Sequence, residues 1–323
     1  IMLNHFPASQ TPDLKGLHYI TASNLPQLDK GDSHDFFNER KPDNQMLPYS
    51  PHRYRCCQHN VAMGWPWYAQ NLWQATSDNG LAVYLYAGSS VTAKVGKDGS
   101  QVTLSMKTDY PFSGSVGIDV EGHGSFPLYL RVPRWCGNLT IKINGEAISQ
   151  TVNPGAYLRI ERQWAAGDSI EITMPMEIAL TRWPRNGSVS VDRGPLSYSV
   201  KIEELWERWE GSEQWPQWEV LPKSPWNYAL VLDPENPSED ILVIEKGISS
   251  DQPWDVDSAP IELRVKAKRI PSWKIGDDNT VEAVPQNLST LGPVETISMI
   301  PLGCARLRMS CLPVALRQKG EKE

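Results

Sequence analysis

Several features that would assign a protein class at once are missing from this sequence. No apolar run approaches the roughly 18 residues that a membrane-spanning helix needs. No run of lysine or arginine occurs, and the formal net charge is -7. The six histidines form no HxxxH or HExxH pattern that would make a zinc site by itself. We therefore expect neither a membrane nor a nucleic acid among the partners.

Cysteine is scarce and its number is odd. Five cysteines stand among 323 residues, so internal disulfides cannot pair all of them, and at least one thiol or metal ligand is expected. Cys136, Cys304 and Cys311 lie on strand-like segments without histidine or carboxylate partners in register, and we expect them in the core. The cysteine content does not decide the cellular compartment of the protein, which could be the bacterial cytoplasm, the periplasm or the outside of the cell.

The opening part of the chain, residues 1–79, is expected to belong to a helical domain. It is loop-rich up to about residue 62 and shows few clear periods. A long segment without regular structure is uncommon in a compact domain, so we expect residues 1–62 to pack over a helical domain that lies mostly upstream of Ile1. An apolar stripe from Trp65 to Trp73 then predicts an amphipathic helix. We therefore expect the chain to be a fragment.

Beyond residue 79 the apolar pattern predicts strands. Apolar residues recur at every second position, as at Val102, Leu104 and Met106, and Asn144-Gly145 is typical of a tight hairpin turn. Short strands separated by turns favour a β-sandwich over residues 80–201. Tryptophans and acidic residues interrupt the alternation after residue 201, so residues 202–323 are expected to hold a Trp-rich linker and a second β-rich domain.

The densest chemistry lies in the stretch HRYRCCQHN at residues 52–60. Thiolates bind zinc, and zinc keeps a bound thiol deprotonated, so the pair Cys56 and Cys57 can supply a ligand and a nucleophile together. Arginines beside the pair would favour the thiolate further. Zinc generally needs four ligands, and this stretch offers only the two cysteines and His59.

Three other interpretations of the cysteine pair stay open. Free cysteine is among the most buried residue types, so Cys56 and Cys57 could both be inert core residues beside a helix start. A strained disulfide between the two neighbours is a third reading. A closed zinc site that only holds the fold together would also use both thiolates.

Motifs along almost the whole chain resemble the DUF1680 proteins, which form glycoside hydrolase family 127, the group of β-L-arabinofuranosidases and their relatives. Four motifs near the start are similar to the end of the catalytic domain of that family: residues 4–13, 17–21, 54–60 and 64–66. Four later motifs are similar to its β-sandwich part: residues 126–133, 192–196, 224–230 and 301–308.

The resemblance implies a fold that is mainly β, with one or two β-sandwich domains preceded by the last part of an (α/α)6 helical barrel. Residues 1–79 would be the C-terminal portion of that catalytic barrel, with the Cys-Cys motif. It also implies a retaining glycosidase with a cysteine thiolate as nucleophile. The substrates implied are β-L-arabinofuranosides or related plant glycans. The alternative is a non-catalytic carbohydrate-binding β-sandwich protein.

The same resemblance assigns residue roles. Cys56 is expected to be the nucleophile and, with Cys57, a ligand of Zn²⁺, while Tyr19 and His59 are expected to contact the substrate. The remaining zinc ligands and the acid/base glutamate are expected upstream of Ile1. The continuation after the cysteine pair departs from typical arabinofuranosidases, which leaves the sugar specificity open. The expected partner is an arabinofuranose-containing glycan, and a homodimer is left open.

Overall fold

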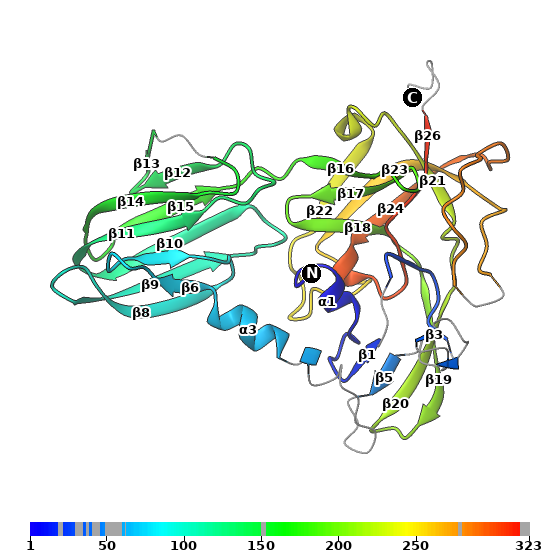
Figure 1. Cartoon of the computed structure of the whole chain (residues 1–323), viewed down its shortest axis with the longest axis horizontal. Helices are drawn as coiled ribbons and strands as arrows, with labels where there is room; N and C mark the ends of the chain where they lie inside the picture. Colours follow the sequence, from blue (N-terminus) through cyan, green and yellow to red (C-terminus); the bar gives the residue numbers. More distant parts are fainter. Residues whose placement is uncertain are drawn as a thin grey trace. The chain divides into compact units, whose positions relative to one another are not determined.

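The computed structural model describes two compact units of mainly β structure (Figure 1). The described residues are 1–18, 22–29, 35–36, 39–40, 46–48, 60–61, 63–149, 153–276 and 280–316. One unit, here called the middle unit, comprises residues 62–177. The other, here called the terminal unit, combines residues 1–61 with 178–323. No helix in the described part of the chain is long and apolar enough to cross a membrane.

The middle unit opens with the helix α3 (Gly64–Gln70) and continues as two sheets. The larger sheet has the order β13 (Glu146–Ala147), β12 (Thr140–Ile143), β15 (Ser169–Thr173), β10 (Ser115–Gly122), β9 (Ser100–Thr108) and β8 (Ser89–Val95). The smaller sheet has the order β14 (Tyr157–Trp164), β11 (Gly124–Arg131), β7 (Leu81–Val83) and β6 (Trp73–Ala75). All neighbours are antiparallel except β7 and β11, which pair in parallel.

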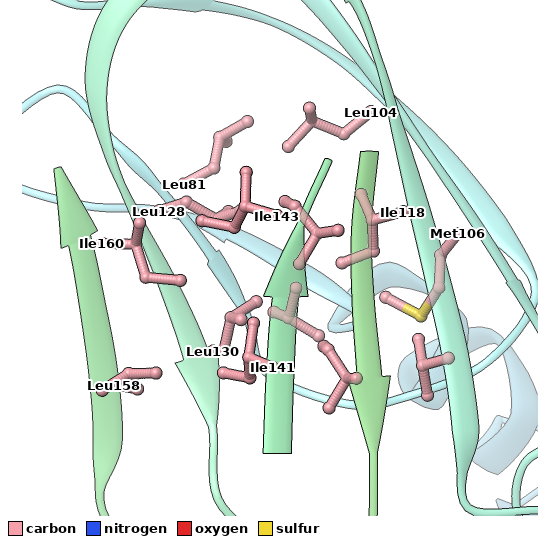
Figure 2. Close-up of a cluster of buried hydrophobic side chains, with 14 of the residues drawn as sticks. Leu81, Leu104, Met106, Ile118, Leu128, Leu130, Ile141, Ile143, Leu158 and Ile160 are labelled. Carbon is pink, nitrogen blue, oxygen red and sulfur yellow. The ribbon is translucent and has the colours of Figure 1, made fainter. Parts of the chain in front are cut away.

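The core of the middle unit follows from alternation along these strands. Val102, Leu104 and Met106 of β9 are buried, while the residues between them are less so. The apolar residues of both sheets form one cluster, which Figure 2 shows between the strands. Because every second side chain of a strand points to the same face, this alternation buries one face of each sheet. The arrangement agrees with the predicted β-sandwich.

The turn at Asn144-Gly145 has the conformation that the sequence predicts. Asn144 has φ 52° and Gly145 φ 82°, and the flanking Ile143 and Glu146 are paired across β12 and β13. A two-residue turn of type I′ needs positive φ at both central positions, which asparagine and glycine tolerate best.

The terminal unit is built on a large sheet and a smaller one. The eight-stranded sheet runs β16 (Ile178–Trp183), β17 (Ser188–Arg193), β18 (Leu196–Val200), β24 (Val294–Pro301), β23 (Ile261–Arg269), β21 (Tyr228–Leu232) and β26 (Val314–Leu316), and β22 (Ile241–Glu245) also pairs with β23. The four-stranded sheet runs β1 (Gly16–His18), β5 (Met46–Pro48), β20 (Pro216–Pro222) and β19 (Glu204–Gly211). Two further pairs are β2 (Asn24–Leu25) with β25 (Arg308–Met309), and β3 (Asp35–Phe36) with β4 (Glu39–Arg40).

The N-terminal segment is fastened to the C-terminal half of the chain. The helix α1 (His5–Ala8) packs against the 3₁₀ helix η2 (Leu302–Cys304). The Asn4 amide donates to the Pro195 carbonyl at 3.0 Å and accepts from the Ser197 N–H at 2.9 Å. The backbones of Leu28 and Val220 exchange hydrogen bonds of 2.8 and 2.7 Å. These bonds explain why residues 1–61 join residues 178–323 in one unit.

The observed units differ from the expected ranges 1–79, 80–201 and 202–323. Residues 178–200 form β16, β17 and β18, and these strands join β24 in the eight-stranded sheet. Residues 204–222, expected as a Trp-rich linker, form the antiparallel hairpin of β19 and β20. The helical barrel predicted before the sandwich is not shown by this structure.

Candidate functional site

All four residues with predicted catalytic, metal or substrate roles lie outside the described residues. These are Tyr19, Cys56, Cys57 and His59. The structure nevertheless describes the strands that lead toward them. β1 ends at His18, directly before Tyr19, and β5 precedes the stretch that carries the cysteines. The roles of the four residues therefore stay predictions.

The strand that precedes Tyr19, β1, pairs with β5, the strand that precedes the cysteine stretch. Leu17 lies opposite Leu47, and His18 lies opposite Met46 in antiparallel register. The His18 side chain is buried, and its backbone N–H donates to the Ser9 carbonyl at 2.6 Å. Because the strands are antiparallel, His18 at the end of β1 lies beside Met46 at the start of β5, so the chain leaves toward Tyr19 and toward the cysteines at opposite ends of this pair.

Two of the three described cysteines are core residues, and the third, Cys311, is less buried than the sequence predicts. Cys136 and Cys304 are fully buried and free, as predicted, and burial raises the pKa of the Cys304 thiol to about 12. Burial is also the main cause of the raised pKa of Cys136. Cys311 is free but only partly buried. The raised pKa values of Cys136 and Cys304 keep these two thiols protonated near neutral pH, so they are poor nucleophiles and poor metal ligands.

The described cysteines therefore do not supply the thiolate donors that the predicted zinc site needs. Within the described residues no group of three or more His, Cys, Asp or Glu side chains could hold a metal ion. Cys56 and Cys57 are the only other cysteines of the chain. Two adjacent sulfur donors are chemically suited to Zn²⁺, because soft thiolates select this metal, so the predicted donor set fits.

Three charged residues form a cluster at η2 and β25: Glu204, Arg306 and Arg308. None of them was predicted as functional from the sequence. The Arg306 guanidinium is buried and donates to three backbone carbonyls: Gln10 at 2.8 Å, Trp254 at 2.6 Å and Cys304 at 3.0 Å. Burial is the main cause of its lowered pKa. These bonds join three separate segments of the terminal unit, which makes Arg306 a structural cross-link.

Glu204, at the start of β19, supplies the negative charge of this cluster. One carboxylate oxygen accepts from the backbone N–H groups of Arg306 and Leu307 at 3.3 and 3.5 Å, and the other accepts from the Trp206 indole at 2.9 Å. Burial raises the pKa of the carboxyl, and Arg306 opposes that shift. Because its oxygens hold a backbone turn in place, the geometry favours a structural role over acid/base catalysis.

Arg308 completes the cluster. Its side chain is 0% exposed, and its three nitrogen atoms have no hydrogen-bond partner in the described part of the chain. Burial, and then the nearby Arg306, lower the pKa of Arg308 to about 10. Arg308 in turn contributes to the lowered pKa of His5, whose main cause is burial. Buried charges of this kind are costly, and the sequence motif alone gives no sign of that burial.

Comparison with known proteins finds a family model that matches most of the middle unit. Residues 80–176 match the family model described as "Beta-L-arabinofuranosidase, GH127 middle domain". This range nearly coincides with the strands of the middle unit. A comparison with curated proteins found no match.

Solved structures share the fold over 98% of this chain. A glycoside hydrolase has 21% sequence identity and a TM-score of 0.69, with 47% of its own chain covered. A GH127 beta-arabinofuranosidase has 17% identity, a TM-score of 0.64 and 46% covered. Ara127N-Se, a GH127 beta-L-arabinofuranosidase from Geobacillus stearothermophilus T6, has 21% identity, a TM-score of 0.59 and 45% covered. The chain thus spans less than half the length of these structures.

Proposed function

We propose that this protein, whose residues 80–176 are a GH127 middle domain, is a retaining glycoside hydrolase that acts on β-L-arabinofuranosides or related plant glycans. The observation that carries the proposal is the family match of the middle unit. The shared fold with GH127 enzymes supports it over nearly the whole chain. A carbohydrate substrate follows from the same family.

In the proposed reaction the Cys56 thiolate attacks the anomeric carbon of the sugar. The bond from sulfur to that carbon forms as the glycosidic bond breaks, and a carboxylic acid gives its proton to the departing oxygen. Water then attacks the same carbon from the face opposite the sulfur, its proton goes to the carboxylate, and the C–S bond breaks as the thiolate leaves. Two inversions at one carbon retain the configuration.

The chain's own residues would divide the remaining work. Zn²⁺ bound by the thiolates of Cys56 and Cys57 would supply one effect, the ionised state of the sulfur at neutral pH. Tyr19 and His59 would hold the sugar ring. The acid/base glutamate is expected upstream of Ile1.

The test is hydrolysis of an aryl β-L-arabinofuranoside by the intact gene product, with the anomeric configuration of the released sugar recorded. We expect retention by the wild type and a loss of kcat of at least about a thousandfold in Cys56→Ser. Cys311→Ser is the matched control, because Cys311 is a free and partly buried thiol, and it should keep the wild-type rate.

Two results would overturn parts of the proposal. Inverted product, or an unchanged rate in Cys56→Ser, would rule out the thiolate nucleophile. A wild-type protein that binds arabinofuranosides but does not cleave them, and binds equally well as Cys56→Ala, would favour the non-catalytic carbohydrate-binding alternative.

A further inference from the structure

A hollow of about 490 Å³ opens on the terminal unit, between the loop after β20 and the loop after β23. It is lined by Pro222, Lys223, Ser224, Pro225, Trp226, Asn227, Arg269, Pro271, Trp273, Lys274 and Ile275. All of these residues lie well away in sequence from Tyr19 and the cysteine pair, and none has a role in the proposed reaction. Its volume lies within the range of about 300–1,000 Å³ that is usual for small-molecule sites.

The shape of the hollow is fixed by hydrogen bonds beneath it. The buried Asn227 amide donates to the Ile270 carbonyl at 2.8 Å and to the Trp273 carbonyl at 3.0 Å. Its backbone carbonyl accepts from the Ile270 N–H at 2.7 Å. Asn227 thus ties the two loops together at several points, so the hollow exists before any ligand enters.

An aromatic pair forms part of the wall. Trp273 is fully buried, and its indole N–H donates to the Glu282 carbonyl at 2.9 Å. Trp226 packs on it edge to face, with ring centroids 5.9 Å apart, and remains partly exposed. A tryptophan held in this way offers a rigid apolar surface with little entropy left to lose, which suits the face of a sugar ring.

The charge of the lining has one sign. Lys223, Arg269 and Lys274 are exposed cations, and none of the lining residues is a carboxylate. Glu282 accepts from the Lys274 backbone N–H at 3.3 Å but does not line the hollow. The chain as a whole carries a net charge of -7, but this surface carries three positive charges around an aromatic side chain. Such a surface attracts an anionic ligand.

We propose that this hollow is a saccharide subsite for carboxylate-bearing glycans, in which Trp226 contacts a sugar face and Lys223, Arg269 and Lys274 contact its carboxylates. That the ligand is a saccharide rests on the proposed function, whereas its negative charge rests on the lining alone. Arg269 already donates to the Asn227 side-chain oxygen at 3.3 Å through Nε, which leaves the rest of its guanidinium for a carboxylate.

The experiment is calorimetric titration of the intact Cys56→Ser protein with a trigalacturonate and with its methyl ester, which removes the charge but keeps the sugar rings. We expect the trigalacturonate to bind more tightly, and the difference to shrink as salt is raised. Lys223→Gln combined with Lys274→Gln should weaken its binding about five- to tenfold. Trp226→Leu should weaken both ligands alike.

The matched control removes two exposed lysines from the middle unit, Lys94→Gln with Lys97→Gln, and should leave binding unchanged. Equal loss in the control variant, equal binding of the ester, or equally tight binding of a polyglutamate would overturn the subsite. Hydrolysis is measured separately on the wild type. Trigalacturonate binding without arabinofuranoside cleavage would contradict only the proposed function, and cleavage without binding would contradict only the subsite.

Discussion

Glu262 gives the sharpest prediction about stability. It lies on β23, its side chain is 8% exposed, and its carboxylate accepts from Lys246 at 2.6 Å, Ser298 at 2.7 Å and Arg264 at 3.2 Å. Burial opposes ionisation, but the bonds from Lys246, Ser298 and Arg264 outweigh it and lower the pKa of Glu262 from 4.5 to about 2. The charged form is therefore favoured by folding.

The sign and size of the effect follow from that shift. A carboxyl whose pKa is lower in the folded protein stabilises it above the unfolded value, and this stabilisation is lost as pH falls from about 4.5 toward 2. At about 1.4 kcal/mol per pKa unit, the lowering of the Glu262 pKa from 4.5 to about 2 contributes at most about 3.5 kcal/mol. Glu262→Gln should therefore lower the free energy of unfolding by about 2–3 kcal/mol at pH 7 and change it little near pH 2.

The assay is urea unfolding of wild type, Glu262→Gln and the control Glu239→Gln at several pH values between 7 and 2. Glu239 is exposed, so its substitution should change stability by less than about 0.5 kcal/mol. A Glu262→Gln penalty that stays constant over this pH range would refute the electrostatic reasoning. So would an equal penalty in Glu239→Gln.

Three further substitutions probe packing and anchoring. Gly303→Ala should destabilise the terminal unit by about 1–3 kcal/mol in thermal unfolding, because an added Cβ would lie 2.6 Å from the Trp254 ring. Gly137→Ala, where a Cβ meets nothing within 4 Å, should be nearly neutral, and equal melting temperatures for the two would contradict this account. Ile118→Ala should cost about 2–5 kcal/mol in urea unfolding, since Ile118 is fully buried in the middle unit, and a cost below about 1 kcal/mol would be inconsistent with that packing. Asn4→Ala removes two hydrogen bonds to the turn between β17 and β18, and should speed hydrogen exchange at Ser197 while leaving the middle unit unchanged.

The sequence was most informative where one face of a strand is buried. β9 and β10 alternate between buried and more exposed residues, so apolar residues recur at every second position and the sequence alone predicts both strands. The hairpin of β19 and β20 was missed for the opposite reason. Most of β19 is exposed on both faces, and a strand of that kind leaves no hydrophobic period to read.

Two features of the structure, the buried Arg306 and the hollow at Trp226, could not be predicted from the pattern of residues along the sequence. The buried position of Arg306 depends on carbonyls of Gln10 and Trp254, which come from distant segments, and no local rule predicts a charged residue in the core. The hollow at Trp226 likewise forms from two loops far apart in sequence. Tyr19, Cys56, Cys57 and His59 rest on family resemblance and on thiolate chemistry, and they stay predictions.

The division of the chain has a consequence for the order of folding during synthesis. The middle unit is continuous, so it can fold as soon as residue 177 has left the ribosome. The terminal unit is interrupted, because residues 1–61 must wait for strands that are translated after the whole middle unit. The segment with the predicted nucleophile therefore belongs to a unit whose remaining strands are translated only after the middle unit. A chain cut short before β24 would lack η2 and β25, which contact α1 and pair with β2, while the middle unit would still be complete.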